Sequence, residues 1–350
     1  MTSALKISAA SAAALCLALL AACDAKGPPP PPPPPPPPAV SLSPRLIEQA
    51  SAYRYYMNHA TAITPDFTDG DSIARSLKIG AAYEPAQLLR GAIAYGAVAA
   101  LQDAEFVAGV RKYAADAAQR REITNQLIQN PNYVLGMTGA PNAAALAIAA
   151  LGTEGQKLYD AGKAVKQSAY DIQHQKWSKS DVANRDLRLS QAKALSATPL
   201  VGDVAETARL QQAALGAESL GLTPSAANPP YTQVVARSLT VAALAALGEA
   251  GDANLDNVMA VMAEPNVASC INMSKLNLYQ CLAVSKPHYE DVFCLGQHVM
   301  MDTGRCVIKA AGLPEPYEPR FVPQVRVAGA ETTPKAASGK GGKKAASKKR

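Results

Sequence analysis

Eleven consecutive prolines, Pro28–Pro38, limit more than any other segment what this chain can form. Proline has no backbone N–H and a fixed φ, so the run is excluded from helix interiors and central strands and must adopt polyproline II. At about 3.1 Å per residue, it predicts a stiff spacer roughly 34 Å long. A ligand for a proline-binding module is the alternative. The run has no flanking specificity residues, so we favour the spacer.

The residues after the spacer carry helix signals throughout. Ser43-Pro44 places an N-cap before a proline at the first helical position, and Glu84-Pro85 opens an apolar segment that ends near Leu101. Thr153 is expected to cap a long helix. Further helices are predicted over residues 103–115, 119–129, 141–151, 181–196, 202–220 and 231–247. No segment alternates as a half-buried strand does. We therefore predict an all-α fold, built as a multi-helix bundle or helical array.

The N-terminus carries a short apolar segment. Residues Ile7–Leu20 follow a lone Lys6, and their length suits the central part of a signal peptide but is too short to span a bilayer. Leu20-Ala21-Ala22-Cys23 comes next and resembles the lipobox of bacterial lipoprotein precursors. An uncleaved anchor helix, or an ordinary signal peptide with a chance cysteine, is the alternative interpretation.

The resemblance covers residues 1–24 and implies a location. In this class the cysteine thiol is acylated and the peptide is cut before it, so Cys23 would be the lipidation site and the membrane the first partner. Two or more acyl chains hold a protein stably on a bilayer. An aspartate after the cysteine resembles a signal for retention, so Asp24 favours the inner membrane, facing the periplasm, over the outer membrane.

These signals divide the chain into five parts. They are a signal peptide over 1–22, a lipid anchor and polyproline stalk over 23–40, an N-terminal helical region over 41–222, a C-terminal helical region over 223–325, and a disordered lysine-rich tail over 326–350. The Gly- and Pro-rich segment 221–230 separates the two helical regions. The sequence does not decide whether those regions are separate domains.

The positive charge is concentrated in the tail. Residues 335–350 contain seven of the 34 basic residues and no acidic residue. The seven are Lys335, Lys340, Lys343, Lys344, Lys348, Lys349 and Arg350. Without these and Lys6, 26 basic residues remain against 28 acids. A flexible chain of seven charges binds dense anionic polymers by counterion release. We expect an anionic envelope polymer or surface, or another envelope protein, as a partner, and no nucleic acid. A solubilising tail without a target is the alternative.

Four cysteines remain in the folded part, at spacings of 11, 13 and 12: Cys270, Cys281, Cys294 and Cys306. An even number in an exported protein predicts two disulfides. If helices flank the break at Lys286-Pro287 as an antiparallel hairpin, Cys281–Cys294 would lie inside Cys270–Cys306. Gly304 is expected to end the second helix before the last cysteine. Sequence alone leaves three connectivities open.

Two histidines near these cysteines suggest an alternative. His288 and His298 would allow a metal site, but the close cysteine pairs of zinc sites are missing. We therefore expect no metal and no other cofactor.

One catalytic signature is present. Ser190-Gln-Ala-Lys193 matches the S-x-x-K of penicillin-binding enzymes, but the companion motifs of those enzymes are not found. We therefore predict a membrane-anchored envelope lipoprotein that acts as a non-enzymatic scaffold, tether or assembly factor. The alternatives are an envelope enzyme that uses Ser190 and Lys193 on peptidoglycan or its peptides, and a ligand-binding module with a groove between helices.

Overall fold

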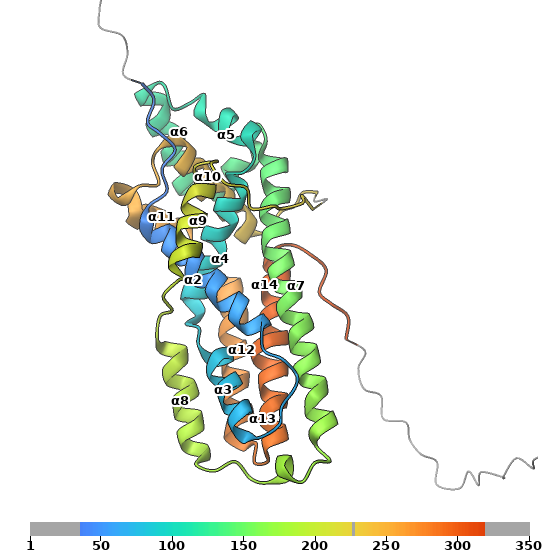
Figure 1. Ribbon diagram of the computed structural model, residues 1–350. Helices are drawn as coiled ribbons and strands as arrows, with labels where there is room; N and C mark the ends of the chain where they lie inside the picture. The colour runs from blue at the N-terminus through green and yellow to red at the C-terminus, as the bar shows by residue number, and fades with distance from the viewer. Residues whose placement is uncertain (1–35, 226–227, 319–350) are drawn as a thin grey trace, which may run out of the picture. The chain divides into compact units, whose positions relative to one another are not determined.

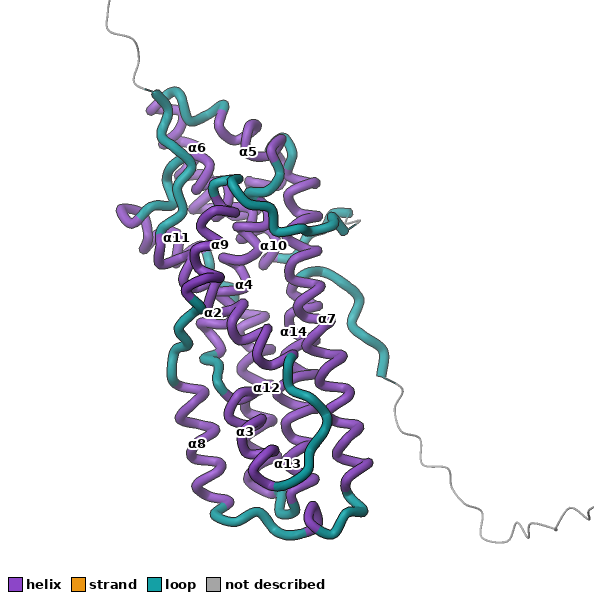
Figure 2. The backbone as a smooth tube through the Cα atoms, in the orientation of Figure 1, coloured by secondary structure: helices purple, strands orange, loops and turns teal. Residues whose placement is uncertain are grey.

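The computed structural model describes residues 36–225 and 228–318 (Figure 1). Within these ranges the regular structure consists of helices, and no β-strand is present (Figure 2). The predicted all-α class is therefore confirmed. The compact body of the protein extends as far as Glu315.

The helices of the first half begin where the sequence supplies a cap or a proline. Their bounds are α2 Pro44–Thr61, α3 Gly70–Ala81, α4 Pro85–Ala100, α5 Ala104–Arg111, α6 Ala117–Gln129, η1 Pro131–Gly136 and α7 Ala140–Ile172. The Glu84 carboxylate, for example, accepts hydrogen bonds from the backbone N–H groups of Ala86 and Gln87 at 2.9 and 2.6 Å. Such bonds satisfy donors that the first turn of a helix leaves unpaired.

The second half contains shorter helices around one long one. Their bounds are η2 Trp177–Lys179, α8 Arg185–Ala197, α9 Val204–Ala214, α10 Gln233–Leu247, η3 Asp252–Asn254, α11 Leu255–Val261, α12 Pro265–Val284, α13 His288–Cys294, η4 Leu295–Asp302 and α14 Thr303–Ala310. Helix α9 is shorter than the predicted 202–220 because Gly216 adopts a left-handed conformation, with φ of 73°.

Helices α4 and α10 form the centre of the core. Most residues of both are buried, and the two helices pack against each other and against α7. A single hydrophobic cluster takes in residues from before and after the 221–230 segment. The two helical regions that the sequence distinguishes therefore share one core.

Helix α7 corrects one prediction, because it runs unbroken through Thr153, where we expected a new helix to begin. Two glycines flank this residue. A Cβ on Gly152 would overlap the side chain of Leu313, and one on Gly155 would lie 2.9 Å from the backbone nitrogen of Ile308. These glycines thus allow close packing, and the tertiary contact outweighs their low helix propensity.

Gly304 corrects a second prediction. We expected it to end a helix before Cys306, but it lies in the first turn of α14, and that helix continues past the cysteine. A Cβ at this position would lie 2.8 Å from the backbone nitrogen of Tyr159 in α7. Here again the glycine permits two helices to approach closely.

The described end of the proline run is fixed to one end of the body. The carbonyl oxygen of Pro38 accepts a hydrogen bond from Nη1 of Arg111 at 3.0 Å, and the backbone N–H of Ser41 donates to the carbonyl of Ala245, also at 3.0 Å. Helices α3, α8 and α13 lie toward the opposite end of the body (Figure 1).

Candidate functional site

The four cysteines form the predicted nested pair of disulfides. Cys281–Cys294 joins α12 to α13 with a Cα separation of 5.7 Å, and Cys270–Cys306 joins α12 to α14 with a Cα separation of 5.8 Å. Both separations lie in the ordinary range for disulfides. The predicted disulfide-stapled C-terminal helical hairpin is confirmed, and its staples fix α12 against the chain that returns beside it.

The structure offers no support for the metal alternative. All four thiols are consumed in disulfides. Nδ1 of His298 lies 2.9 Å from Oδ2 of Asp302, whereas His288 lies near Trp177, with 6.4 Å between the ring centroids. Among the described residues, no group of three or more His, Cys, Asp or Glu side chains could hold a metal ion.

Ser190 and Lys193 both lie on the exposed side of α8. The Lys193 ammonium is 5.9 Å from the ring centroid of Tyr279, and no hydrogen bond joins it to Ser190 in the described part of the chain. The S-x-x-K match therefore does not correspond to an assembled serine–lysine pair.

A different lysine and serine do meet, in the core. The Lys275 amine donates to the carbonyl oxygen of Ala81 at 2.6 Å and to Oγ of Ser196 at 3.0 Å, and lies 3.4 Å from the ring centroid of Tyr83. Burial lowers the pKa of Lys275 well below its ordinary value. Because the lysine and the serine are 3% and 5% exposed, a substrate has no access to them. We interpret this contact as structural.

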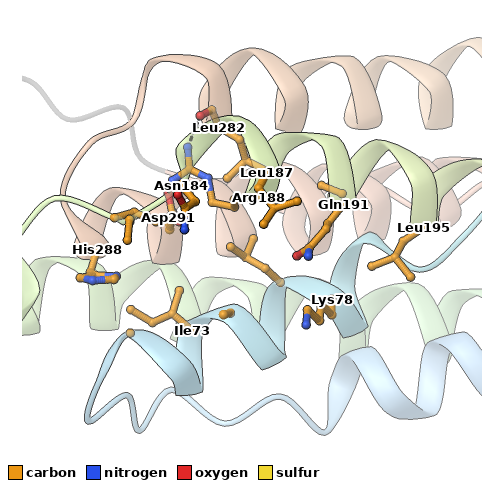
Figure 3. Close-up of a pocket in the computed structure, with 16 residues that line it drawn as sticks. Ile73, Lys78, Asn184, Leu187, Arg188, Gln191, Leu195, Leu282, His288 and Asp291 are labelled. Carbon is orange, nitrogen blue, oxygen red and sulfur yellow. Dashed lines mark hydrogen bonds and ion pairs between the residues drawn. The ribbon is translucent and has the colours of Figure 1, made fainter.

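A pocket of about 190 Å³ lies between α3 and α8 and is the candidate binding site (Figure 3). Helix α3 lines it with residues that recur at helical spacing: Gly70, Ile73, Ala74, Leu77 and Lys78. Helix α8 contributes a matching face: Leu187, Arg188, Gln191, Ala192 and Leu195. The stapled hairpin supplies Leu282, His288 and Asp291. Two amphipathic helices thus meet over the hairpin without filling the space between them.

A buried ion pair forms the polar part of this pocket. Arg188 of α8 pairs with Asp291 of α13, and the same guanidinium donates to the carbonyl oxygen of Leu282. Oγ of Ser285 donates to the Asp291 carboxylate at 2.8 Å. Burial raises the pKa of the Asp291 carboxyl, and the Arg188 charge opposes that rise. The pair is 103 residues apart in sequence and carries no local motif, so sequence reasoning missed it.

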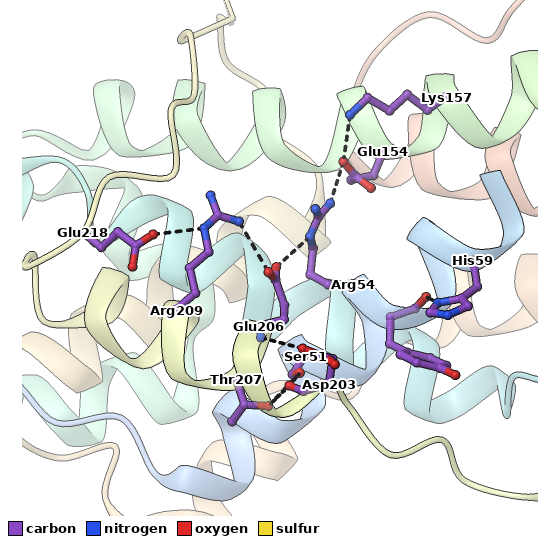
Figure 4. Close-up of polar contacts among 11 residues, drawn as sticks. Ser51, Arg54, His59, Glu154, Lys157, Asp203, Glu206, Thr207, Arg209 and Glu218 are labelled. Atoms are coloured by element: carbon purple, nitrogen blue, oxygen red, sulfur yellow. Dashed lines mark hydrogen bonds and ion pairs between the residues drawn. The ribbon is translucent and has the colours of Figure 1, made fainter. Parts of the chain in front are cut away.

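A second polar cluster fixes α9 to the body (Figure 4). The Arg54 guanidinium of α2 lies 2.6 Å from the Glu154 carboxylate of α7 and 3.1 Å from the Glu206 carboxylate of α9. Glu206 also pairs with Arg209 at 3.4 Å, and Arg209 pairs with Glu218 at 3.2 Å. These contacts tie three helices together and line no pocket that we assign to a ligand.

Several predicted site residues lie outside the described residues. They are Cys23, most of the proline run, and the basic tail residues Lys335, Lys340, Lys343, Lys344, Lys348, Lys349 and Arg350. Among the described residues, no single helix has both the length and the apolar character needed to cross a membrane. Helices α4 and α5 would pass that test together, but they are bent by 90°.

Fold and site define a disulfide-stapled, all-α protein with a pocket between α3 and α8. Comparisons with protein-family models, with curated proteins and with solved structures found no match to this chain.

Proposed function

We propose that the protein is a lipid-anchored envelope lipoprotein that acts as a non-enzymatic scaffold, tether or assembly factor. The observation that carries the proposal is the nested pair Cys281–Cys294 and Cys270–Cys306. Structural disulfides persist in oxidising compartments such as the periplasm and are rare in the cytosol. The Leu20–Cys23 motif implies export on separate grounds. The disulfides and the Leu20–Cys23 motif lie toward opposite ends of the chain, and both favour an exported protein.

The attachment of the stalk supports a scaffold role. Arg111 holds the carbonyl of Pro38, so the last residue of the proline run is fixed to the body and cannot swing freely. If the rest of the run forms the stiff polyproline stalk that the sequence predicts, it would transmit that fixed direction over its length. An anchor at Cys23 would then present α3, α8 and α13, which lie at the end of the body away from the start of the described chain, to the envelope beyond the membrane (Figure 1).

The basic tail would supply the second contact of a tether. Its seven positive charges suit an anionic envelope polymer or the acidic face of another envelope protein. The enzyme alternative gains no support from the geometry, because Ser190 and Lys193 are exposed on α8 and are not joined by a hydrogen bond among the described residues.

Replacement of the anchoring thiol tests the proposal. A Cys23→Ser variant should leave the detergent phase on phase partitioning and should lack the mass of the acyl chains in intact-protein mass spectrometry. Cys16→Ser is the matched control, because that thiol lies in the predicted signal peptide. Equal partitioning of the Cys23→Ser and wild-type proteins, with a mass difference no larger than the exchange of sulfur for oxygen, would contradict the lipid anchor.

A second measurement tests the tether itself. Replacing the seven basic tail residues with glutamine should reduce cosedimentation of the protein with purified peptidoglycan or with anionic vesicles, and added salt should weaken wild-type binding in the same assay. Binding that is unchanged by both treatments would remove the tail from the proposal.

A further inference from the structure

The α3–α8 pocket has the size and the walls of a small-molecule site. Its volume of about 190 Å³ is comparable with an engineered cavity of about 150 Å³ that binds benzene. Ile73 and Leu77 line it from α3 and are nearly fully buried, whereas Leu187 lines it from α8 and is 55% exposed. An exposed leucine at the rim of an apolar pocket gives an apolar ligand a route in and a surface to cover.

The charges that line the pocket do not cancel. Arg188 is compensated by Asp291, since the two form a buried ion pair. Lys78 is exposed, and within the described residues its ammonium makes no hydrogen bond or ion pair. Apart from His288, the lining residues therefore carry one net positive charge, located on α3 beside the apolar wall. Lys78 directly follows Leu77 in sequence, so the positive charge and the apolar wall of the pocket lie on the same turn of α3.

We propose that this pocket binds a small amphipathic monoanion, a carboxylate with a short alkyl chain or a single ring. The apolar part would lie between Ile73, Leu77 and Leu187, and the carboxylate would pair with Lys78. Gln191 of α8 also lines the pocket and offers an amide to the same head group (Figure 3). This assignment goes beyond the proposed tether role and does not depend on the lipid anchor.

The disulfides give the site its rigidity. Leu282 lies next to Cys281 in α12, and Asp291 lies three residues before Cys294 in α13. The Cys281–Cys294 bond therefore fixes the two elements that form the pocket floor. A floor held in this way lowers the ordering cost of binding, because little of the site has to move when a ligand enters.

Photo-crosslinking of the full chain tests the proposal. The probe is octanoate with a terminal diazirine, and the labelled peptides are mapped by mass spectrometry. We expect label in α3 and α8, and we expect unlabelled octanoate to compete better than 1-octanol. Phenylacetate, a carboxylate with a single ring, is used as a second competitor beside octanoate, a carboxylate with an alkyl chain. The two competition midpoints should differ, and the difference shows which apolar group the pocket accepts. Label spread over the chain without enrichment in α3 and α8 would overturn the proposal.

Two variants with matched controls sharpen the test. Ala74→Phe fills the pocket from an exposed position of α3 and should abolish the labelling, whereas Ala194→Phe on an exposed, non-lining position of α8 should not. Lys78→Gln should raise the competition midpoint of octanoate by about three- to fivefold and leave that of 1-octanol unchanged. Lys163→Gln is the control for the loss of one charge. Undiminished labelling of Ala74→Phe would show that the ligand does not bind in the α3–α8 pocket. Equal competition by octanoate and 1-octanol would show that the pocket does not select an anionic head group.

Discussion

Gly155 of α7 and Gly304 of α14 face each other with their backbones in close contact. A Cβ on Gly304 would lie 2.9 Å from the carbonyl oxygen of Gly155, and a Cβ on Gly155 would lie 3.1 Å from the carbonyl oxygen of Gly304. The same reciprocal relationship joins Gly162 to Gly296, at 3.0 and 2.9 Å. Neither helix could carry a side chain at these points without moving away from the other.

The spacing of these glycines explains the π-helical segment η4. The two contacts are seven residues apart on α7, between 155 and 162, but eight residues apart on the facing chain, between 296 and 304. A π-helix holds more residues per turn than an α-helix, because its hydrogen bonds span five residues instead of four. The π-helical turns of η4, Leu295–Asp302, thus absorb the extra residue and keep both glycine contacts in register.

Substitution of Gly304 tests this packing. Gly304→Ala should lower the free energy of unfolding by about 1–3 kcal/mol, because the new methyl group forces α14 away from α7. The measurement is urea denaturation followed by circular dichroism. Gly136→Ala is the matched control, since a Cβ at that exposed position would meet no atom within 4 Å. A loss no larger than that of the control would contradict the close-contact interpretation.

The glycines also mark the limit of what the sequence could predict. Caps and prolines identified the starts of α2 and α4, because those signals act within a few residues. The local sequence around Gly304, or around the glycines beside Thr153, does not show whether the glycine ends a helix or lets a second helix pack closely against it. Only the facing helix decides between these roles, and it lies more than a hundred residues away in sequence for Gly304.

The candidate site illustrates the same limit. The cysteine pairing could be predicted because each disulfide joins segments on either side of one turn, and helical geometry relates them. The α3–α8 pocket could not, because Leu77 and Leu187 look like ordinary core positions of two amphipathic helices. Which apolar faces meet, and whether they fill the space between them, depends on the whole packing.

The two disulfides should differ in their contributions to stability. They close loops with sequence separations of 36 and 13 residues. Chain entropy predicts about 2–4 kcal/mol for each, with about 0.9 kcal/mol more for the longer loop. The double variant Cys270→Ala/Cys306→Ala should therefore unfold at lower urea concentration than Cys281→Ala/Cys294→Ala. Identical midpoints for wild type and both variants under oxidising conditions would contradict the two bonds.

Loss of Arg54 should be costly. Its side chain is 12% exposed, and those of its partners Glu154 and Glu206 are 6% and 15% exposed. Arg54→Met leaves two poorly solvated carboxylates without their main counter-charge and should cost about 3–5 kcal/mol in urea denaturation. Arg209→Met, at a 36% exposed position of the same cluster, should cost less than about 1 kcal/mol. Adding Glu206→Gln to Arg54→Met should restore part of the loss. Equal costs for the two arginines would show that burial is not decisive here.

Lys275 gives the protein a pH dependence whose sign follows from its burial. The pKa of its ammonium lies well below the ordinary value of 10.5 in the folded protein, because the amine is desolvated. The unfolded chain therefore binds more protons than the folded one at pH values between the folded pKa and 10.5. In that window the free energy of unfolding rises with pH, by up to about 1.4 kcal/mol per pH unit.

Lys275→Met should remove this slope. The free energy of unfolding of the wild type, measured by urea denaturation at pH 7 and pH 9, should be larger at pH 9, and the variant should show less of this increase. Both values lie below the ordinary pKa of tyrosine, so the buried Tyr53, Tyr56 and Tyr83, whose pKa values are raised, do not contribute. At pH 7 the variant should be the more stable protein, because methionine has no ammonium group to desolvate and the former partners of the lysine stay paired. The Ala81 carbonyl oxygen still accepts from the Tyr83 backbone N–H at 2.9 Å, and Ser196 still donates to Ala192 at 2.7 Å. Lys163→Met, at an exposed position, should leave the slope as it is. Equal slopes in wild type and Lys275→Met would mean that Lys275 keeps its ordinary pKa in the folded state.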